Sequence, residues 1–269
     1  MRGGFRVLSL LVALVAPVLT GAGSSHALEP AVETGSAFDF LPTELTIFDP
    51  ADRQVIGHGR YSVSTTEGVE VVEGENEYLD GRRDRELERL KLGAPGDARL
   101  LLSAEHSFFG VNGALRVVDR LDTRTGAASC TEYVRGTPRV RRATLTVPAD
   151  TYAGATQLML VVARLRQGQR ERITLHSFNC LPGPRIIPVE ASVSPKRELW
   201  AMYPGELARI EFRPDLGWLG VLISPFLPTM EVWFDPADRW NYVGATFDRF
   251  YKGEHILTVR ARTRKLPAE

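Results

Sequence analysis

The stretch Val69-Glu70-Val71-Val72-Glu73-Gly74-Glu75-Asn76-Glu77-Tyr78-Leu79-Asp80-Gly81 indicates how this chain folds. Apolar and polar side chains alternate along residues 69–78, and successive side chains of a strand point to opposite faces of a sheet. The dipeptide Asp80-Gly81 tolerates the positive φ of a tight hairpin turn. We therefore predict a strand, a turn and a second strand over residues 82–92, although the charged residues of that segment would also suit a helix.

The same alternation recurs along the chain, for example at residues 60–64 and 256–260. Further turn dipeptides separate these segments, at Asn112-Gly113, Thr125-Gly126, Gln167-Gly168 and Lys252-Gly253. Strands separated by turns at such intervals are typical of antiparallel β proteins. The predicted fold class is mostly β, as an antiparallel sandwich or an open or half barrel, with little helix after the N-terminal segment.

The hexapeptide Phe48-Asp49-Pro50-Ala51-Asp52-Arg53 recurs unchanged at residues 234–239. Aspartate followed by proline suits a type I turn, because the carboxylate accepts a bond from a local amide and proline fixes φ. Both copies are therefore predicted to be hairpin turns, and a duplicated β unit is the alternative. A calcium site from Asp49 and Asp52 would need about six to eight oxygen ligands, and no further acidic cluster adjoins them.

The N-terminus has the pattern of an export signal. Arg2 and Arg6 start an apolar run over residues 7–19, and Ser25-His26-Ala27 fits a small-residue cleavage site. The apolar run is shorter than the roughly 20 residues that cross a bilayer as a helix. We predict a signal peptide over residues 1–27, a periplasmic or secreted mature chain without a transmembrane segment, and a flexible lead-in over residues 28–39.

A β-rich domain is predicted over residues 40–266. Prolines crowd into residues 182–195, which indicates a linker or a crossing between sheets, and all four tryptophans follow. A Trp-rich subdomain from about residue 195 is therefore an alternative to a single domain.

Charge and cysteine content narrow the function classes. The chain has 33 basic and 33 acidic side chains, so it offers no overall positive charge for nucleic acid. Cys130 and Cys180 are the two cysteines, and an even count in an exported chain favours a disulfide between them. The alternative is a catalytic thiol with His176 as its base.

Motifs that carry chemistry are mostly missing. The sequence has no G-x-S-x-G elbow, phosphate loop, H-E-x-x-H or G-x-G-x-x-G motif. Glu105 and His106 are adjacent, so on a strand they would face opposite ways. The glutamates of residues 70–77 are interpreted as a solvated face rather than a catalytic pair. We therefore predict no catalytic residue, no metal site and no cofactor.

Residues 216–230 form the segment for which we predict a binding role. These fifteen residues carry no charge, and glycines and prolines interrupt any long helix or strand. A buried connection would explain the pattern, whereas a pocket wall or lid would use its large apolar side chains to contact a ligand. The predicted ligand-binding residues are Trp218, Leu219, Leu222, Ile223, Phe226 and Leu227.

Several short motifs together carry a resemblance. The export signal, Gly57-x-Gly59-x-Tyr61, the hairpin at residues 78–82 and residues 150–154 resemble uncharacterised exported bacterial β proteins. More distantly, these are similar to open half-barrel carriers of the lipoprotein-localisation type. The resemblance implies a curved sheet that wraps an apolar ligand in the periplasm, and it assigns no functional residue.

The sequence therefore favours a non-catalytic exported protein that binds a hydrophobic small molecule, a lipid or another envelope-derived ligand. Envelope proteins are a further class of partner. The alternatives are a secreted hydrolase of envelope polymer, and a structural or interaction protein without a small-molecule site.

Overall fold

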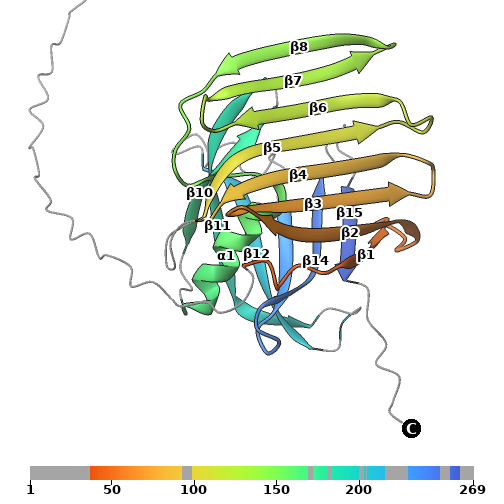
Figure 1. The fold of residues 1–269 in the computed structure, drawn as a ribbon. Helices are drawn as coiled ribbons and strands as arrows, with labels where there is room; N and C mark the ends of the chain where they lie inside the picture. Colours follow the sequence, from red (N-terminus) through yellow and green to blue (C-terminus); the bar gives the residue numbers. More distant parts are fainter. Residues whose placement is uncertain are drawn as a thin grey trace, which may run out of the picture.

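A computed structural model of the chain describes residues 37–92, 99–168, 172–180, 183–199, 203, 205–215, 230–248 and 255–260. These residues form one sheet of 15 strands and a single α-helix (Figure 1). The strand order is β8-β7-β6-β5-β4-β3-β2-β1-β15-β14-β13-β12-β11-β10-β9, and only the pair β9–β10 is parallel. The predicted mostly β fold class is confirmed, in the form of an open sheet.

The bounds of the elements follow the chain in order. The first eight strands are β1 (Glu44–Phe48), β2 (Val55–Thr66), β3 (Val69–Tyr78), β4 (Arg83–Lys91), β5 (Leu100–Phe109), β6 (Leu115–Asp122), β7 (Ala127–Val134) and β8 (Thr137–Thr144). After them come β9 (Thr151–Tyr152), α1 (Gly154–Arg166), β10 (Ile173–Asn179), β11 (Arg185–Leu199), β12 (Glu206–Pro214), β13 (Met230–Asp235), β14 (Asn241–Asp248) and β15 (His255–Arg260).

The hairpin predicted from residues 69–92 is β3 and β4. Val72 and Leu90 are buried on the inner face of the sheet, whereas Glu73 lies on the outer face in an ion pair with Arg85. Gly81 has φ +86° in the turn between the strands, a conformation that other residues adopt at a cost. Alternation and turn chemistry agree, so this hairpin forms as predicted.

Both copies of the hexapeptide are hairpin turns, as predicted. The first connects β1 to β2 and the second connects β13 to β14. The Asp49 carboxylate accepts a hydrogen bond from the Ala51 amide at 2.8 Å, and the Asp235 carboxylate accepts one from the Ala237 amide at 2.9 Å. Because β1 and β13 run in opposite directions, the two turns lie at opposite ends of the strands.

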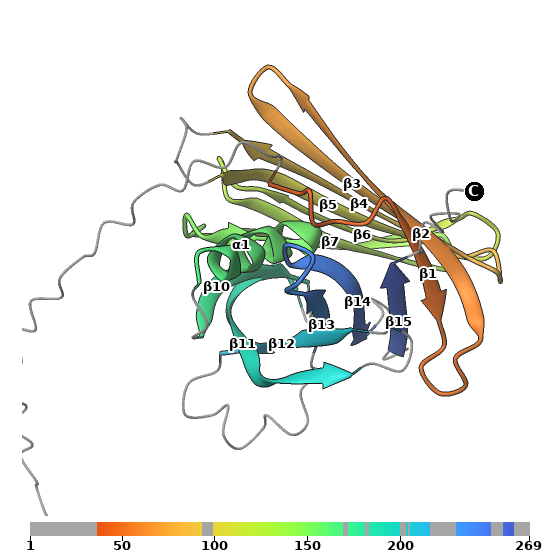
Figure 2. The same ribbon diagram turned by 90° about the horizontal axis from the view of Figure 1, so that it is seen from below.

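The sheet is strongly curled, as Figure 2 shows from below. Cys130 of β7 and Cys180, which follows β10, form a disulfide with their Cα atoms 5.7 Å apart. This confirms the predicted pairing. The Tyr152 hydroxyl of β9 also donates a hydrogen bond to the carbonyl of Arg99, which precedes β5. Among the described residues, no strand pairing joins β8 to β9 and closes the sheet into a barrel. The disulfide is therefore the covalent link between strands near the two ends of the sheet.

Helix α1 lies between the arc of β10–β14 and the strands β3–β7 (Figure 2). Its buried residues Leu158, Val161, Val162 and Leu165 have the spacing of one helix face. This helix was not predicted from the sequence, in which Gln167-Gly168 indicated a hairpin turn. Gly168, at φ +82°, instead ends the helix.

The proline-rich segment is not a linker. Residues 185–199, which include Pro188 and Pro195, form β11 between β10 and β12. The register between β11 and β12 shifts between Val193 and Arg197, which accommodates a proline in the strand. The strands of the last third pair onward to β1 in the same sheet. The predicted signal peptide lies outside the described residues.

Candidate functional site

An apolar groove lies where the β1–β2 and β3–β4 turns meet the start of β15. Its volume of about 740 Å³ is within the range of about 300–1,000 Å³ that small-molecule sites occupy. The apolar lining is supplied by Pro50, Ala51, Val55, Ile56, Tyr78, Leu79 and Ile256, and the charged rim by Asp49, Asp80 and Arg82. The groove could therefore hold an apolar group with a polar end.

The floor of the groove is a small hydrophobic cluster. Ile47, Tyr78 and Ile256 are buried there, and Ile56 packs against them. The Tyr78 hydroxyl donates a hydrogen bond of 2.8 Å to Asp84, which fixes the ring at the base of the groove. Leu79, in contrast, is 70% exposed, which leaves a large apolar side chain free to contact a ligand.

The ligand-binding residues predicted from the sequence all lie outside the described residues: Trp218, Leu219, Leu222, Ile223, Phe226 and Leu227. The strand ends that flank their segment are described. β12 ends at Pro214 and β13 begins at Met230, which is in register with Phe212.

These flanking ends lie at the end of the sheet that carries the groove. β13 runs parallel to β15, because both pair antiparallel with β14, and Ile256 at the start of β15 lines the groove. β13 is two strand spacings from β15, or about 10 Å.

A buried acidic cluster lies on the inner face of the sheet, at the N-terminus of α1. Asp84, Glu86 and Glu88 follow one another on the same side of β4. The Glu88 carboxylate accepts a hydrogen bond of 2.9 Å from the Thr156 amide in the first turn of α1. Gly154 has φ +41°, a conformation that favours glycine, and a Cβ there would displace the carboxylate ends of Glu86 and Glu88.

Burial controls the protonation of this cluster. Burial, together with the nearby charge of Asp84, raises the pKa of Glu86 from 4.5 to about 7, while a hydrogen bond from the Ala155 amide opposes the shift. Burial also raises the pKa of Glu88 well above its ordinary value, together with the nearby charge of Glu86, while the Thr156 amide opposes the shift. Near neutral pH this cluster therefore holds protons that exposed carboxylates would have lost.

His106 lies between two carboxyl groups in strand register, opposite Glu86 on β4 and opposite Asp119 on β6. Burial lowers the pKa of His106 to about 3 and raises that of Asp119 to about 6. The sequence analysis did not bring these three residues together, because their meeting depends on the register of β4, β5 and β6. The one related prediction was that Glu105 and His106 face opposite sides of the sheet.

The remaining candidate chemistry is limited. Both sulfurs are in the disulfide, so the catalytic thiol alternative is wrong. His176 instead contacts Asp150, with 2.8 Å between Nδ1 and Oδ1. Asp119 lies near Cys130 and Cys180, but disulfide sulfurs are not the thiolates that bind metal ions.

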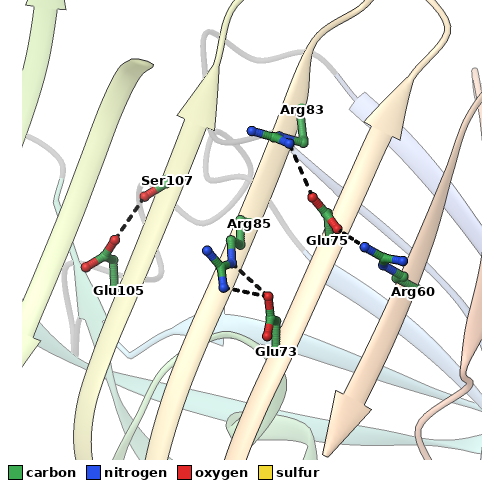
Figure 3. A network of polar contacts seen from close by, with 7 residues as sticks. All are labelled: Arg60, Glu73, Glu75, Arg83, Arg85, Glu105 and Ser107. Carbon is green, nitrogen blue, oxygen red and sulfur yellow. Dashed lines mark hydrogen bonds and ion pairs between the residues drawn. The ribbon is translucent and has the colours of Figure 1, made fainter. Parts of the chain in front are cut away.

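The outer face of β2–β5 carries a network of paired charges, drawn in Figure 3. Glu75 contacts both Arg60 and Arg83, and Glu73 contacts Arg85 at 2.7 Å. Such exposed pairs contribute little to stability. These pairs, together with the exposure of Glu77, confirm that Glu73, Glu75 and Glu77 belong to a solvated face. Glu70 differs, because it is buried and paired with Arg99.

None of the helices in the described part of the chain has the length and apolar content needed to span a membrane.

Comparison with solved structures finds a protein of similar fold. It is a β-barrel-like protein of the domain of unknown function DUF1849 from Brucella abortus, with 11% sequence identity and a TM-score of 0.44. The match covers 83% of this chain and 97% of the other. No family model and no curated protein matches the chain.

Proposed function

We propose that this chain is an exported, non-catalytic β protein that binds a hydrophobic or envelope-derived ligand in the groove above Ile47, Tyr78 and Ile256. Residues 216–230 cover the bound ligand, and Trp218 and Phe226 contact it. A periplasmic or secreted location goes with this proposal, because it follows from the predicted signal peptide. The similarity to lipoprotein-localisation carriers belongs to the same proposal.

The observation that carries the proposal is the apolar groove itself. Its volume suits a small ligand, and Leu79 and Val55 keep large apolar surfaces in contact with solvent. Burying such side chains against a ligand contributes about 1.5–3 kcal/mol each. β12 ends and β13 begins at the end of the sheet that carries the groove, and this supports a binding role for the segment between them.

The alternative function, a secreted hydrolase of envelope polymer, would use Glu86, His106 and Asp119. None of these residues lines the groove, which is why we prefer a binding function. The third possibility, a structural protein, offers no reason for an exposed Leu79 at the edge of a groove.

The test begins with the mature chain purified after export. Native mass spectrometry and solvent extraction should recover a bound apolar molecule, and a fluorescent fatty acid should compete with it. Leu79→Glu should weaken binding of the fluorescent fatty acid about tenfold or more, because a charge replaces an apolar contact. Trp218→Ala should weaken it as well.

Val111→Glu is the matched control. Val111, like Leu79, is an exposed apolar residue in a turn at this end of the sheet, with 66% of its surface exposed. It is not among the residues that line the groove. Its substitution should leave binding unchanged. Absence of any bound apolar molecule, together with no binding of the fluorescent fatty acid, would contradict the proposed function.

A further inference from the structure

Strand β8 is a free edge of the sheet. Among the described residues it pairs with β7 on one side and with no strand on the other. All of its residues except one are exposed, on both faces of the strand. Natural sheets usually cover or shorten such an edge, because its unpaired backbone groups can take up a further strand.

The register shows which backbone groups point outward. Val134 pairs with Thr137 across the two-residue turn Arg135-Gly136, in which both residues have positive φ. In such a hairpin the residues flanking the turn form a hydrogen-bonded pair, and the following pairs alternate. The outward groups of β8 therefore belong to Pro138, Val140, Arg142 and Thr144. Three of these residues offer an N–H, and all four offer a carbonyl.

The same edge carries more arginines than acids. Arg135, Arg139, Arg141 and Arg142 form no ion pair with any described residue, although Glu132 lies opposite Arg139 in register. Several arginines of the neighbouring strands differ, because Arg60, Arg83, Arg85 and Arg120 each contact a glutamate (Figure 3 shows the first three). Among the described residues, no arginine of β8 has such a contact.

The disulfide holds this edge in place. Cys130 is the residue of β7 opposite Arg141, and its bond to Cys180 fixes β7 to the other end of the sheet. A fixed edge loses less conformational entropy when a further strand binds to it.

We propose that β8 binds an extended, acidic segment of a partner protein, which adds to the sheet as a sixteenth strand. Backbone groups of Val140, Arg142 and Thr144 form the ladder, and the arginines select carboxylates at alternate positions of the segment. A second copy of this chain does not fit, because pairing β8 with itself would bring arginines together. The proposal does not depend on the proposed ligand groove.

The experiment uses the whole mature chain and a synthetic peptide of about eight residues, the length of β8, in which glutamate and threonine alternate. Fluorescence anisotropy of the labelled peptide should show saturable binding that weakens at high salt. A peptide with N-methyl groups at alternate residues, and one with lysine in place of glutamate, should each bind at least tenfold more weakly.

Two variants of the protein separate strand addition from simple charge attraction. Arg139→Glu/Arg141→Glu/Arg142→Glu should abolish binding, because it reverses the charge of the edge. Val140→Pro keeps all charges and removes one outward N–H, so it should also weaken binding at least tenfold. Because that N–H makes no bond to β7, the variant should fold, which circular dichroism checks. Arg124→Glu, in the β6–β7 turn, is the control and should bind normally.

Three results would overturn the proposal. One is the absence of peptide binding to the folded chain. Another is peptide binding that Val140→Pro leaves intact, since that would mean charge attraction alone. The third is binding to phosphatidylglycerol vesicles without binding to the peptide, which would identify an anionic membrane surface as the partner.

Discussion

Glu86 is the residue whose protonation should most affect stability. Its folded-state pKa of about 7 lies above the ordinary value of 4.5, so the folded chain binds more protons than the unfolded chain between these two values. The free energy of unfolding therefore falls as pH rises through this range and levels off above pH 7. Asp119, with a pKa raised to about 6, acts in the same direction.

We predict that Glu86→Gln is more stable than the wild type at pH 8, by about 1–3 kcal/mol, and nearly equal to it at pH 5. Urea denaturation at both pH values measures this. Glu73→Gln, on the solvated outer face of β3, is the matched control. If Glu86→Gln were destabilised equally at both pH values, the carboxyl group would be stabilising the fold through its contacts rather than opposing it through its charge.

Individual residues of the inner face were the hardest to foresee. The spacing of Glu105 and His106 correctly indicated opposite faces, but no pattern indicated that Glu86 and Asp119 would flank His106. Their meeting requires the register of three strands. The groove could not be predicted for the same reason. Leu79 and Ile256 are far apart in the sequence, and they meet because β15 pairs with β1.

Among the elements, the two hexapeptide turns allow a comparison of identical sequence in different surroundings. The Asp49 carboxylate accepts one hydrogen bond, from the Ala51 amide. The Asp235 carboxylate accepts bonds from two backbone amides and from the Tyr203 hydroxyl, the last at 2.8 Å. We predict that Asp49→Ala costs about 1 kcal/mol of unfolding free energy and Asp235→Ala about 2 kcal/mol or more. Thermal and urea unfolding of both variants check the order, and equal losses would show that the additional partners contribute nothing.

The elements themselves followed from the sequence where a local cause sufficed. The β3–β4 hairpin needed only alternation and Asp80-Gly81, and each hexapeptide needed only its own aspartate and proline. Helix α1 was missed because its nearly continuous apolar run over residues 158–163 suits a buried strand as well as a helix, and because the turn-type dipeptide Gln167-Gly168 follows it. β11 was obscured by Pro188 and Pro195, whose local preference the pairing with β10 and β12 overrides.

At the scale of the whole molecule, closure of the sheet depends on one covalent bond. The sequence predicted the disulfide from the cysteine count, but it did not predict that the bond joins the two ends of a curled sheet. The chain between Cys130 and Cys180 spans 50 residues and includes β8, β9, α1 and β10. In the chain-entropy model, a loop of that length stabilises the fold by about 4 kcal/mol.

We predict that Cys130→Ser/Cys180→Ser lowers the free energy of unfolding by about 2–4 kcal/mol, measured by urea denaturation. Its effects on binding should differ between the two proposed sites. The groove lies among β1–β4 and β15, which hydrogen-bonded neighbours hold on both sides, so the folded variant should bind an apolar ligand normally. The β8 edge loses its anchor and should bind the acidic peptide more weakly. A variant with wild-type stability, or one that loses both activities equally while still folded, would show that the disulfide does not hold the two ends of the sheet together.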